Sequence, residues 1–310
     1  PRHFAPSRRM ILTQDDMPAI CDYEGSNYRT DFWEGRGRDY EDRVERIAIR
    51  RLLPKSGKRL VEIGSAFGRL TNEYDGYEQV ILLDYSFSQL QYAQEHYGRD
   101  GRFIYVAANA YQLPLQAGVC DGATIIRVLH HMKDVPKIFS EVRRILAPNS
   151  TFLLEFANKR HVKSMLRYAL RKQDWNPYDL APVEFVELNF DFHPRYIAQE
   201  LARAGFSTEK RLPVSFFRLG ALKKLPVGLL VGLDALLQHT PFFYTPSIFT
   251  RNIANGTGTN ALTANTPETL FQCPETGENL VRDGDVMRAP KSGLRYAIRD
   301  GIYDFKAPLD

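Results

Sequence analysis

Residues 59–71, RLVEIGSAFGRLT, are the stretch that decides the fold. A short apolar run leads to Glu62, and small residues then stand at alternate positions, Gly64, Ala66 and Gly68. Small residues let another group approach the backbone closely. The pattern therefore predicts a strand, a tight turn and a helix, with the turn facing a ligand. The alternative is a tight strand-to-helix connection that binds nothing.

Apolar runs of strand length alternate with helical patterns on both sides of this stretch. The predicted strands are residues 59–63, 79–84, 102–107, 121–128 and 151–157. Helices are predicted over 40–53, 86–97 and 134–146, with Ser86 and Asp134 as the caps of the last two. Strands that alternate with helices indicate an α/β fold, a doubly wound and mostly parallel sheet with helices on both faces.

The composition limits the class of protein. A chain of 310 residues with 44% hydrophobic and 25% charged residues is typical of a soluble globular protein, and its net charge of +4 does not require a nucleic-acid partner. Cys21, Cys120 and Cys273 show no paired spacing, which fits a reducing, cytoplasmic location. The first residues show no signal peptide, and the most apolar run, residues 225–237, is too short to span a bilayer.

The spacing of the small residues separates two classes of cofactor. A dinucleotide-binding turn has the pattern Gly-x-Gly-x-x-Gly, in which the third glycine packs the helix against the strand. Counting from Gly64, the third position is Arg69, whose bulk argues against an NAD-dependent oxidoreductase. The spacing acid-x-Gly-x-Gly-x-Gly fits Glu62, Gly64 and Gly68, with Ala66 as the one departure.

Three further segments complete a family resemblance. Asp84 ends the second predicted strand, where a carboxylate can accept hydrogen bonds from the ribose hydroxyls of an adenosine. The segments ANAYQLPL, residues 108–115, and DGATIIRVLHHMKDVPKIFSEVRRILAPNSTFLLEF, residues 121–156, follow it. With the first turn they resemble class I, Rossmann-like S-adenosylmethionine-dependent methyltransferases over roughly residues 40–255. Asn109, in place of the usual acid, and Asn149 and Ser150, in place of two glycines, depart from that pattern.

The resemblance implies a seven-stranded sheet that binds S-adenosylmethionine and releases S-adenosylhomocysteine. It assigns the methionine part to Glu62, Gly64, Ser65, Ala66 and Gly68, the ribose to Asp84 and Tyr85, the adenine to Asn109 and Ala110, and the opening toward the acceptor to Arg127 and Leu129.

A catalytic base is needed only if the methyl acceptor must lose a proton, because the sulfonium already activates the methyl group. The candidates are His131, with its neighbour His130, and His193 and Tyr178. Packing is the alternative for the histidine pair, and a helix start before Pro194 is the alternative for His193.

Two insertions are expected to form a lid over the acceptor, residues 158–192 and 218–246. The first contains the basic stretch NKRHVKSMLRYALRKQ, and the second is apolar. Their composition favours a small-molecule acceptor over nucleic acid, and residues 222–238 could contact a membrane surface or a second copy. The chain is expected to be a monomer or a homodimer. The alternatives are a non-catalytic S-adenosylmethionine-binding scaffold, or a methyltransferase acting on RNA or protein.

A second resemblance concerns the C-terminal segment. LFQCPETGENLV, residues 270–281, and LRYAIRDGIYDF, residues 294–305, resemble a methyltransferase-activator zinc ribbon that has lost its metal ligands. Cys273 remains, while Thr276, Ala289 and Ser292 occupy the other ligand positions, so no metal is predicted. The expected organisation is an N-terminal extension over 1–39, a methyltransferase domain over 40–254, a linker over 255–267 and a small β-rich ribbon module over 268–310.

Overall fold

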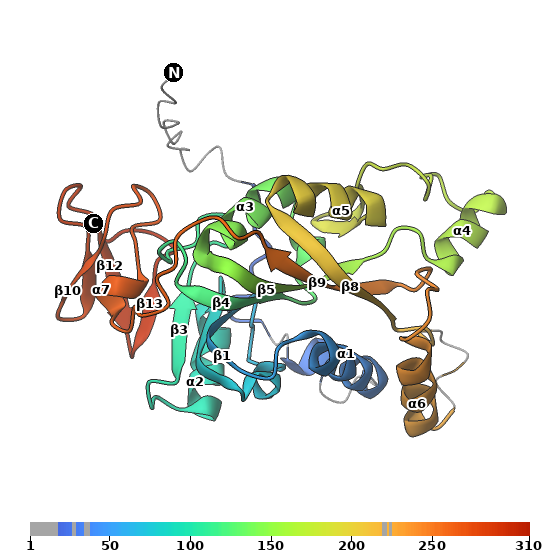
Figure 1. The fold of residues 1–310 in the computed structure, drawn as a ribbon, viewed down its shortest axis with the longest axis horizontal. Helices are drawn as coiled ribbons and strands as arrows, with labels where there is room; N and C mark the ends of the chain where they lie inside the picture. Colours follow the sequence, from blue (N-terminus) through green and yellow to red (C-terminus); the bar gives the residue numbers. More distant parts are fainter. Residues whose placement is uncertain (1–17, 27–28, 34–37, 219–221, 223–224) are drawn as a thin grey trace, which may run out of the picture.

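One sheet of eleven strands runs through the molecule (Figure 1). The computed structural model describes residues 18–26, 29–33, 38–218, 222 and 225–310. The strand order is β10-β11-β12-β13-β3-β2-β1-β4-β5-β9-β8. The strands of this sheet are β1 Gly57–Ile63, β2 Tyr77–Asp84, β3 Phe103–Ala107, β4 Cys120–Ile125, β5 Leu146–Ala157, β8 Phe206–Val214, β9 Ser247–Ala254, β10 Val281–Asp283, β11 Val286–Arg288, β12 Arg295–Arg299 and β13 Ile302–Asp304.

The sheet is larger than the seven strands that the sequence predicts. Seven strands, β1–β5 with β8 and β9, lie within residues 57–254, and β10–β13 join their free edge. The neighbouring pairs from β3 to β5 are parallel, whereas β9 is antiparallel to both β5 and β8. The prediction did not include the C-terminal strands in the sheet because it treated them as a separate unit.

Helices cover both faces of the sheet, as predicted (Figure 1). Alternate residues of a strand point to opposite faces, so Leu60 packs with the helix α1 side of the sheet, while Val61 and Ile63 pack with the α3 side. The helices are α1 Asp39–Leu52, α2 Phe87–Tyr97, α3 Val135–Ile145, α4 Val162–Ala169, α5 Pro194–Arg203, α6 Val227–Leu237 and the short α7 Pro267–Leu270, with a π-helical turn at Arg29–Trp33 and 3-10 turns at Thr71–Tyr74 and Leu129–His131.

Two predicted helix starts are confirmed by their capping bonds. The Ser86 side chain accepts a hydrogen bond from the backbone N–H of Gln89, and the Asp134 side chain accepts one from Lys137. Such bonds satisfy N–H groups that have no partner within the helix. The predicted end of the fourth strand at residue 128 is wrong, because Arg127 adopts a left-handed backbone with φ 62 and β4 stops at Ile125.

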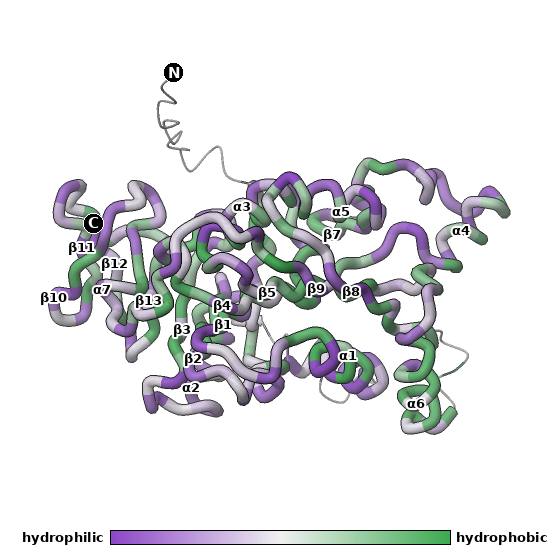
Figure 2. Tube along the Cα trace, viewed as in Figure 1, coloured by the Kyte–Doolittle hydropathy of each residue, from purple (hydrophilic) through white to green (hydrophobic). Residues whose placement is uncertain are grey.

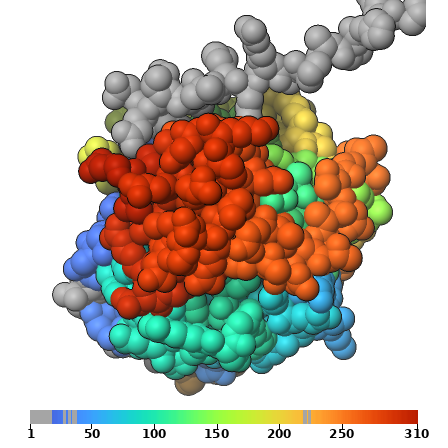
Figure 3. Space-filling view, turned by 90° about the vertical axis from the view of Figure 1, so that its left-hand side faces the viewer, coloured from blue at the N-terminus to red at the C-terminus, as the bar shows by residue number. Residues whose placement is uncertain are grey.

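The C-terminal module, residues 268–310, is joined to the rest of the protein by backbone pairing. Strand β13 runs parallel to β3 and pairs Ile302 with Tyr105, and the Phe305 N–H donates to the Ala107 carbonyl at 2.7 Å. Phe271 and Phe305 are buried at the same junction, with ring centroids 5.1 Å apart. Figure 3 shows the module as a continuous cover over this end of the molecule. The module therefore continues the main sheet and its apolar core.

The segment predicted as a linker, residues 255–267, is fastened along its length. Arg143 Nη2 donates to the Asn255 carbonyl at 2.8 Å, and the Ala261 N–H donates to the Gly118 carbonyl at 2.9 Å. Arg59 donates to the Ala264 carbonyl. These contacts hold the connection against the body of the molecule.

The two insertions lie at the end of the molecule opposite the C-terminal module (Figure 1). The first holds α4 and a hairpin of β6 Val183–Val186 and β7 Asn189–Asp191, and the second holds α6. Helix α6 is apolar along its length (Figure 2). Across the described residues, no helix combines the length and the apolar character that a bilayer span requires.

Candidate functional site

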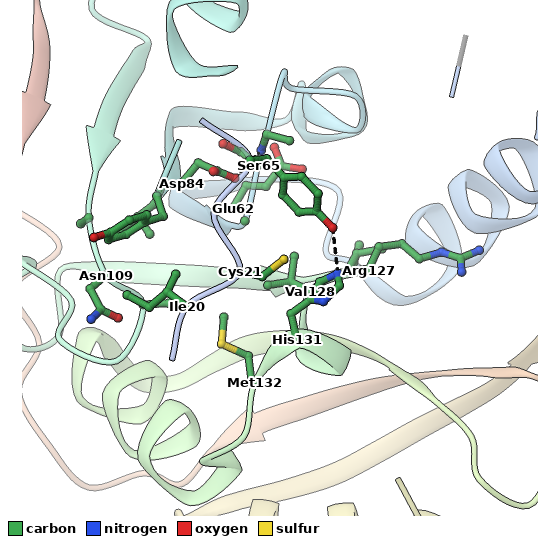
Figure 4. Close-up of a pocket in the computed structure, with 18 of the residues that line it drawn as sticks. Ile20, Cys21, Glu62, Ser65, Asp84, Asn109, Arg127, Val128, His131 and Met132 are labelled. Atoms are coloured by element: carbon green, nitrogen blue, oxygen red, sulfur yellow. Dashed lines mark hydrogen bonds between the residues drawn. The ribbon is translucent and has the colours of Figure 1, made fainter. Parts of the chain in front are cut away.

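A pocket lies where β1, β2, β3 and β4 reach their carboxyl ends (Figure 4). Its empty volume is about 940 Å³, part of it open to solvent. Ligands of doubly wound sheets bind in this place, outside the carboxyl ends of the strands. The walls come from the first turn, from Asp84 and Tyr85, from residues 108–111 and 126–128, from His131 and Met132, and from N-terminal residues 19–23.

The first turn has the conformation that its small residues predict. Gly64 has φ 74, and a Cβ on it would lie 2.2 Å from Val128 Cγ2. Gly68 has φ 79, and a Cβ there would lie 2.6 Å from the Tyr97 ring. Gly68 itself does not line the pocket. Ala66 also has a positive φ, 45 degrees, so its methyl group is held in a conformation that favours glycine.

Ser65 presents an unsatisfied polar group. Its Oγ is buried and has no hydrogen-bond partner among the residues that the structure describes. Buried hydroxyl groups are nearly always bonded, so an isolated one indicates a missing partner. Because Ser65 lines the pocket, a bound ligand would be that partner.

Asp84 is fixed at the end of β2 by backbone donors. Its Oδ2 accepts from the Ala66 N–H at 2.7 Å, and its Oδ1 accepts from the Ser86 N–H at 2.9 Å. Burial raises the pKa of this carboxyl to about 6, although these N–H donors lower it in part. Each carboxylate oxygen can accept more than one hydrogen bond. Asp84 is therefore oriented and still able to bind hydroxyl groups in the pocket.

Glu62 is the second buried acid of the pocket. Its oxygens accept from Thr71 Oγ1 at 2.9 Å and from the Tyr74 hydroxyl at 3.2 Å. Burial raises the pKa of Glu62 to about 7, because these neutral donors offset only part of the cost of a buried charge. A cation bound in the pocket would favour the ionised carboxylate.

The far end of the pocket is formed by the loop after β3. The Asn109 Oδ1 accepts from the Tyr111 N–H at 2.9 Å, which leaves its Nδ2 donor without a partner among the described residues. Ala110 lines the wall beside it, and Tyr85 lines the opposite side. The Nζ of Lys306, from the C-terminal module, lies 5.4 Å from the Tyr85 ring centroid. The module thus reaches the border of the pocket.

Arg127 lines the pocket, but its guanidinium turns toward α1 (Figure 4). Its Nε donates to Glu45 Oε1 at 2.6 Å, and Arg69 Nη2 lies 2.8 Å from Glu45 Oε2. We call these three residues the arginine clamp. Burial alone would raise the pKa of Glu45, yet the two guanidinium groups outweigh it and hold the pKa below its usual value. No sequence pattern predicts the role of Glu45, because its partners Arg69 and Arg127 are 24 and 82 residues away.

An N-terminal strap, residues 18–26, crosses the pocket and was also missed by the sequence analysis. The Glu24 carboxylate accepts from the N–H groups of Phe87, at 2.6 Å, and Ser88, at 3.1 Å, and so holds the strap on the start of α2. Ile20 and Cys21 then line the pocket wall. Of the predicted N-terminal extension, residues 1–17 lie outside the described part.

His131 stands at the strap side of the pocket with both ring nitrogens engaged. Its Nδ1 lies 2.8 Å from the Leu188 carbonyl, which only a protonated nitrogen can satisfy. Its Nε2 lies 3.3 Å from the Tyr23 hydroxyl and is then the acceptor. Burial lowers the pKa of His131, so the imidazole is neutral at neutral pH.

The other predicted catalytic residues do not reach the pocket. The His193 Nδ1 accepts from the Arg195 N–H at 3.1 Å and caps α5. Tyr178 is exposed, and its ring packs edge-on against Tyr168 with centroids 6.2 Å apart. His130 does not line the pocket, and burial lowers its pKa well below the usual value.

The predicted ligand positions of the C-terminal module are linked by a carboxylate. Glu278 accepts from the N–H groups of Lys291 at 2.9 Å and Ser292 at 3.0 Å, and from the hydroxyl of Thr276 at 3.2 Å. Cys273 Sγ lies 3.5 Å from the Tyr296 hydroxyl. The described residues contain no cluster of three or more histidine, cysteine or acidic side chains that could hold a metal. The absence of zinc stays a prediction.

Part of this sheet is similar to a known family of domains. Residues 61–154 match the family model of the methyltransferase domain. The O-methyltransferase cnsE of Penicillium expansum is 26% identical over 164 residues, which are 50% of this chain and 59% of that protein. An O-methyltransferase of Pyrenophora dematioidea is 27% identical over 114 residues, 35% of this chain and 43% of that protein. The chain thus spans only part of the length of either relative.

A solved structure shows the same fold. It is a Haloferax volcanii complex between the Trm112 methyltransferase activator and the putative methyltransferase. The TM-score is 0.51 at 16% identity, and the match covers 74% of this chain and 98% of that chain. The chain therefore has an α/β methyltransferase fold with a mostly parallel central sheet.

Proposed function

We propose that this chain uses S-adenosylmethionine to methylate an oxygen atom of a small molecule. The observation that carries the proposal is the pocket at the strand ends, which combines two acids, Glu62 and Asp84, with the buried and unpartnered hydroxyl of Ser65. The match of residues 61–154 to the methyltransferase domain supports the reaction type. The names of the two fungal relatives support an oxygen acceptor.

The polar groups of the pocket would match the successive parts of the cofactor. Glu62 and Ser65 would hold the charged methionine part. A cation would stabilise the ionised form of Glu62, whose pKa is raised, and Ser65 Oγ would obtain the hydrogen bond that it lacks. Asp84 would accept hydrogen bonds from the ribose hydroxyls. The Nδ2 group of Asn109 would donate to an adenine ring nitrogen, since its oxygen already accepts from Tyr111.

The strap would exclude water from the pocket, and His131 would accept the proton of the acceptor. When bound, the cofactor supplies a methyl group that its sulfonium already activates. Ile20 and Cys21 lie against the pocket and would keep water from it. His131 Nε2 would accept the proton that an acceptor hydroxyl loses as its oxygen bonds to carbon, while the Leu188 carbonyl holds the Nδ1 proton and fixes the tautomer.

The walls around His131 indicate the chemistry of the acceptor. Ile20, Tyr23, Trp33 and Met132 line the same pocket as His131 and are apolar or aromatic. The hydroxyl that lies on His131 Nε2 in the structure is itself a phenol, that of Tyr23. We therefore favour a small aromatic or lipophilic hydroxyl compound, which would displace Tyr23 from Nε2.

A turnover assay with matched variants tests the proposal. The purified chain is incubated with S-adenosylmethionine and a panel of phenols, and S-adenosylhomocysteine is measured. We expect His131→Gln to lower kcat by about 10²–10⁴-fold with little change in cofactor affinity. His193→Asn, which keeps a capping side chain on α5, is the control and should leave kcat unchanged.

Two results would contradict the proposal. Tight cofactor binding without turnover on any acceptor would favour a non-catalytic scaffold. Turnover on RNA or protein, and on no small molecule, would assign a different acceptor.

We also propose that the C-terminal module stabilises the catalytic domain as a fused docking unit. Strand β13 supplies backbone partners to β3, which would otherwise be an open edge. Removing residues 265–310 should increase aggregation but leave S-adenosylmethionine affinity within about tenfold, because the cofactor residues lie outside the module. Unchanged melting and solubility would identify an independent appendage. Loss of cofactor binding in a chain that remains folded would instead place the module in the site.

A further inference from the structure

The exposed face of α6 is apolar and has no charged side chain. Leu229 is 52% exposed and Leu236 is 67% exposed, and Leu225, Gly228, Gly232 and Leu233 are exposed with them. The one acid of the helix, Asp234, is buried on the opposite face, where it accepts from the Tyr40 hydroxyl at 2.5 Å. A face this apolar is unusual on the surface of a protein and requires an explanation.

Helix α4 combines an apolar stripe with a basic one. Val162, Leu166 and Leu170 follow each other at four-residue spacing, and the last two are 57% and 63% exposed. Lys163 and Arg167 stand one position further on and form a neighbouring stripe, and Arg171 and Lys172 follow just after the helix ends at Ala169. Residues 158–173 contain six lysines and arginines and no acid. Among the described residues, no acid forms an ion pair with any of the four exposed cations Lys163, Arg167, Arg171 and Lys172.

The two helices lie at the same end of the molecule and are linked by the segment that follows α6 (Figure 1). The Val162 N–H donates to the Tyr244 carbonyl at 2.9 Å, which ties the start of α4 to the segment after α6. Arg160 lies 5.6 Å from the Tyr244 ring centroid and 5.7 Å from that of Tyr178. Phe242 and Tyr244 are exposed between the helices. The α4–α6 surface therefore projects beyond β8 and β9, at the end away from the C-terminal module (Figures 1 and 2).

We propose that the α4–α6 surface binds the face of an anionic lipid bilayer. The leucines match acyl chains, the unpaired cations match lipid phosphates, and tyrosines suit the depth of the headgroups. The charge decides against a second copy, since a two-fold contact through this surface would place like-charged stripes together. The apolar face decides against nucleic acid, whose phosphate backbone would leave the leucines exposed to water. The inference does not depend on the proposed reaction.

Vesicle flotation tests the proposal directly. Full-length protein is mixed with vesicles of pure phosphatidylcholine, or of equal parts phosphatidylcholine and phosphatidylglycerol, at low and high salt. We expect binding to the anionic vesicles at least about tenfold tighter than to the neutral ones, and weaker at high salt. Equal binding to both, or binding to neither, would overturn the proposal.

Three variants separate the two parts of the surface. Leu229→Gln with Leu233→Gln and Leu236→Gln should abolish stable vesicle binding. Lys163→Gln, Arg167→Gln, Arg171→Gln and Lys172→Gln together should abolish the preference for anionic lipid. The matched control removes four exposed charges elsewhere, at Lys55, Arg99, Lys210 and Lys291, and should bind as the parent does. A control that loses binding equally would show a non-specific charge effect and overturn the assignment.

The oligomeric state gives an independent readout. Each variant should remain folded, because the substituted side chains are exposed. Sedimentation and circular dichroism check this expectation. The parent chain could instead form a stable dimer that the three leucine substitutions convert to a monomer, while neither protein binds vesicles. That result would assign the surface to a second copy and overturn the proposal.

Discussion

Two buried glutamates, one on helix α1 and one in strand β1, have opposite pKa shifts, and the difference separates a structural acid from a functional one. Glu45, in the arginine clamp, and Glu62, in the pocket, are both buried. Burial favours the neutral form of each, but Glu45 has two guanidinium partners and its pKa is lowered, whereas Glu62 has two hydroxyl partners and its pKa is raised to about 7. The charge of Glu45 is neutralised within the fold by two arginines, whereas the charge of Glu62 would be neutralised by a bound ligand.

The largest effect should follow from breaking the clamp. Glu45→Gln keeps the shape of the side chain but removes the acid partner of the buried Arg127 guanidinium and leaves Arg69 paired with Asp42 alone, so unfolding free energy should fall by about 3–5 kcal/mol. Urea denaturation measures it. Glu95→Gln, at an exposed position on α2, is the control and should cost less than about 0.5 kcal/mol.

The pH dependence of this effect has a defined sign. Because the pKa of Glu45 is lower in the folded state, its contribution to stability is present above the usual pKa of a glutamate and is lost as pH falls below it. A loss for Glu45→Gln that is equally large in acid and at neutral pH would contradict the role of the charge.

The second effect should appear in cofactor affinity. Asp84→Ala removes a charged acceptor for two hydroxyl groups and should weaken S-adenosylmethionine binding by about 2–3 kcal/mol. Calorimetry measures the change, and Asp84→Asn, which keeps an acceptor oxygen for only one of the Ala66 and Ser86 N–H groups, shows how much affinity a neutral side chain of the same shape retains. Unchanged affinity in both variants would remove Asp84 from the site.

A smaller effect should come from titrating Glu62. With a pKa of about 7, the carboxyl is neutral below pH 7 and must release a proton to pair with a cation. S-adenosylmethionine affinity should therefore fall as pH drops below 7, by up to about tenfold per unit, and level off above it. Glu62→Gln should flatten this profile, leaving the weaker contribution of Asp84, whose pKa is about 6. A profile that Glu62→Gln leaves unchanged would show that this carboxyl does not face the cation.

The smallest expected effect is that of metal removal. Purified protein should contain no stoichiometric zinc, and a chelator should leave its melting temperature unchanged, because Thr276, Ala289 and Ser292 cannot replace thiolates. Elemental analysis is the measurement. One zinc per chain would show that Cys273 binds the metal together with ligands other than the residues at the ribbon positions.

The features that the sequence predicts are those that local patterns determine. Small residues at alternate positions predict the first turn, where side chains on Gly64 or Gly68 would meet Val128 or Tyr97, and Ser86 predicts a helix start. Glu45 could not be predicted in the same way. Its partner Arg127 is 82 residues away, and an acid on an amphipathic helix is usually exposed.

The strap also could not be predicted from the sequence. Glu24 has no helical or strand pattern around it, and its role depends on N–H groups at Phe87 and Ser88, more than sixty residues later. The family resemblance assigned Arg127 to the opening toward the acceptor, but its left-handed backbone and the charge of Glu45 turn the guanidinium away. Contacts between distant residues leave no periodic signal in a single sequence.

The pairing of β13 with β3 also sets the order in which the sheet can be completed. A ribosome makes the chain from its N-terminus, so Tyr105 emerges long before its partner Ile302. Throughout that interval the seven-stranded part can fold, yet β3 presents free N–H and carbonyl groups along its edge. A nascent chain is therefore most prone to pair with a neighbour on the same polysome between the synthesis of β9 and that of β13. The pairing of β13 with β3 covers this edge and ends that risk.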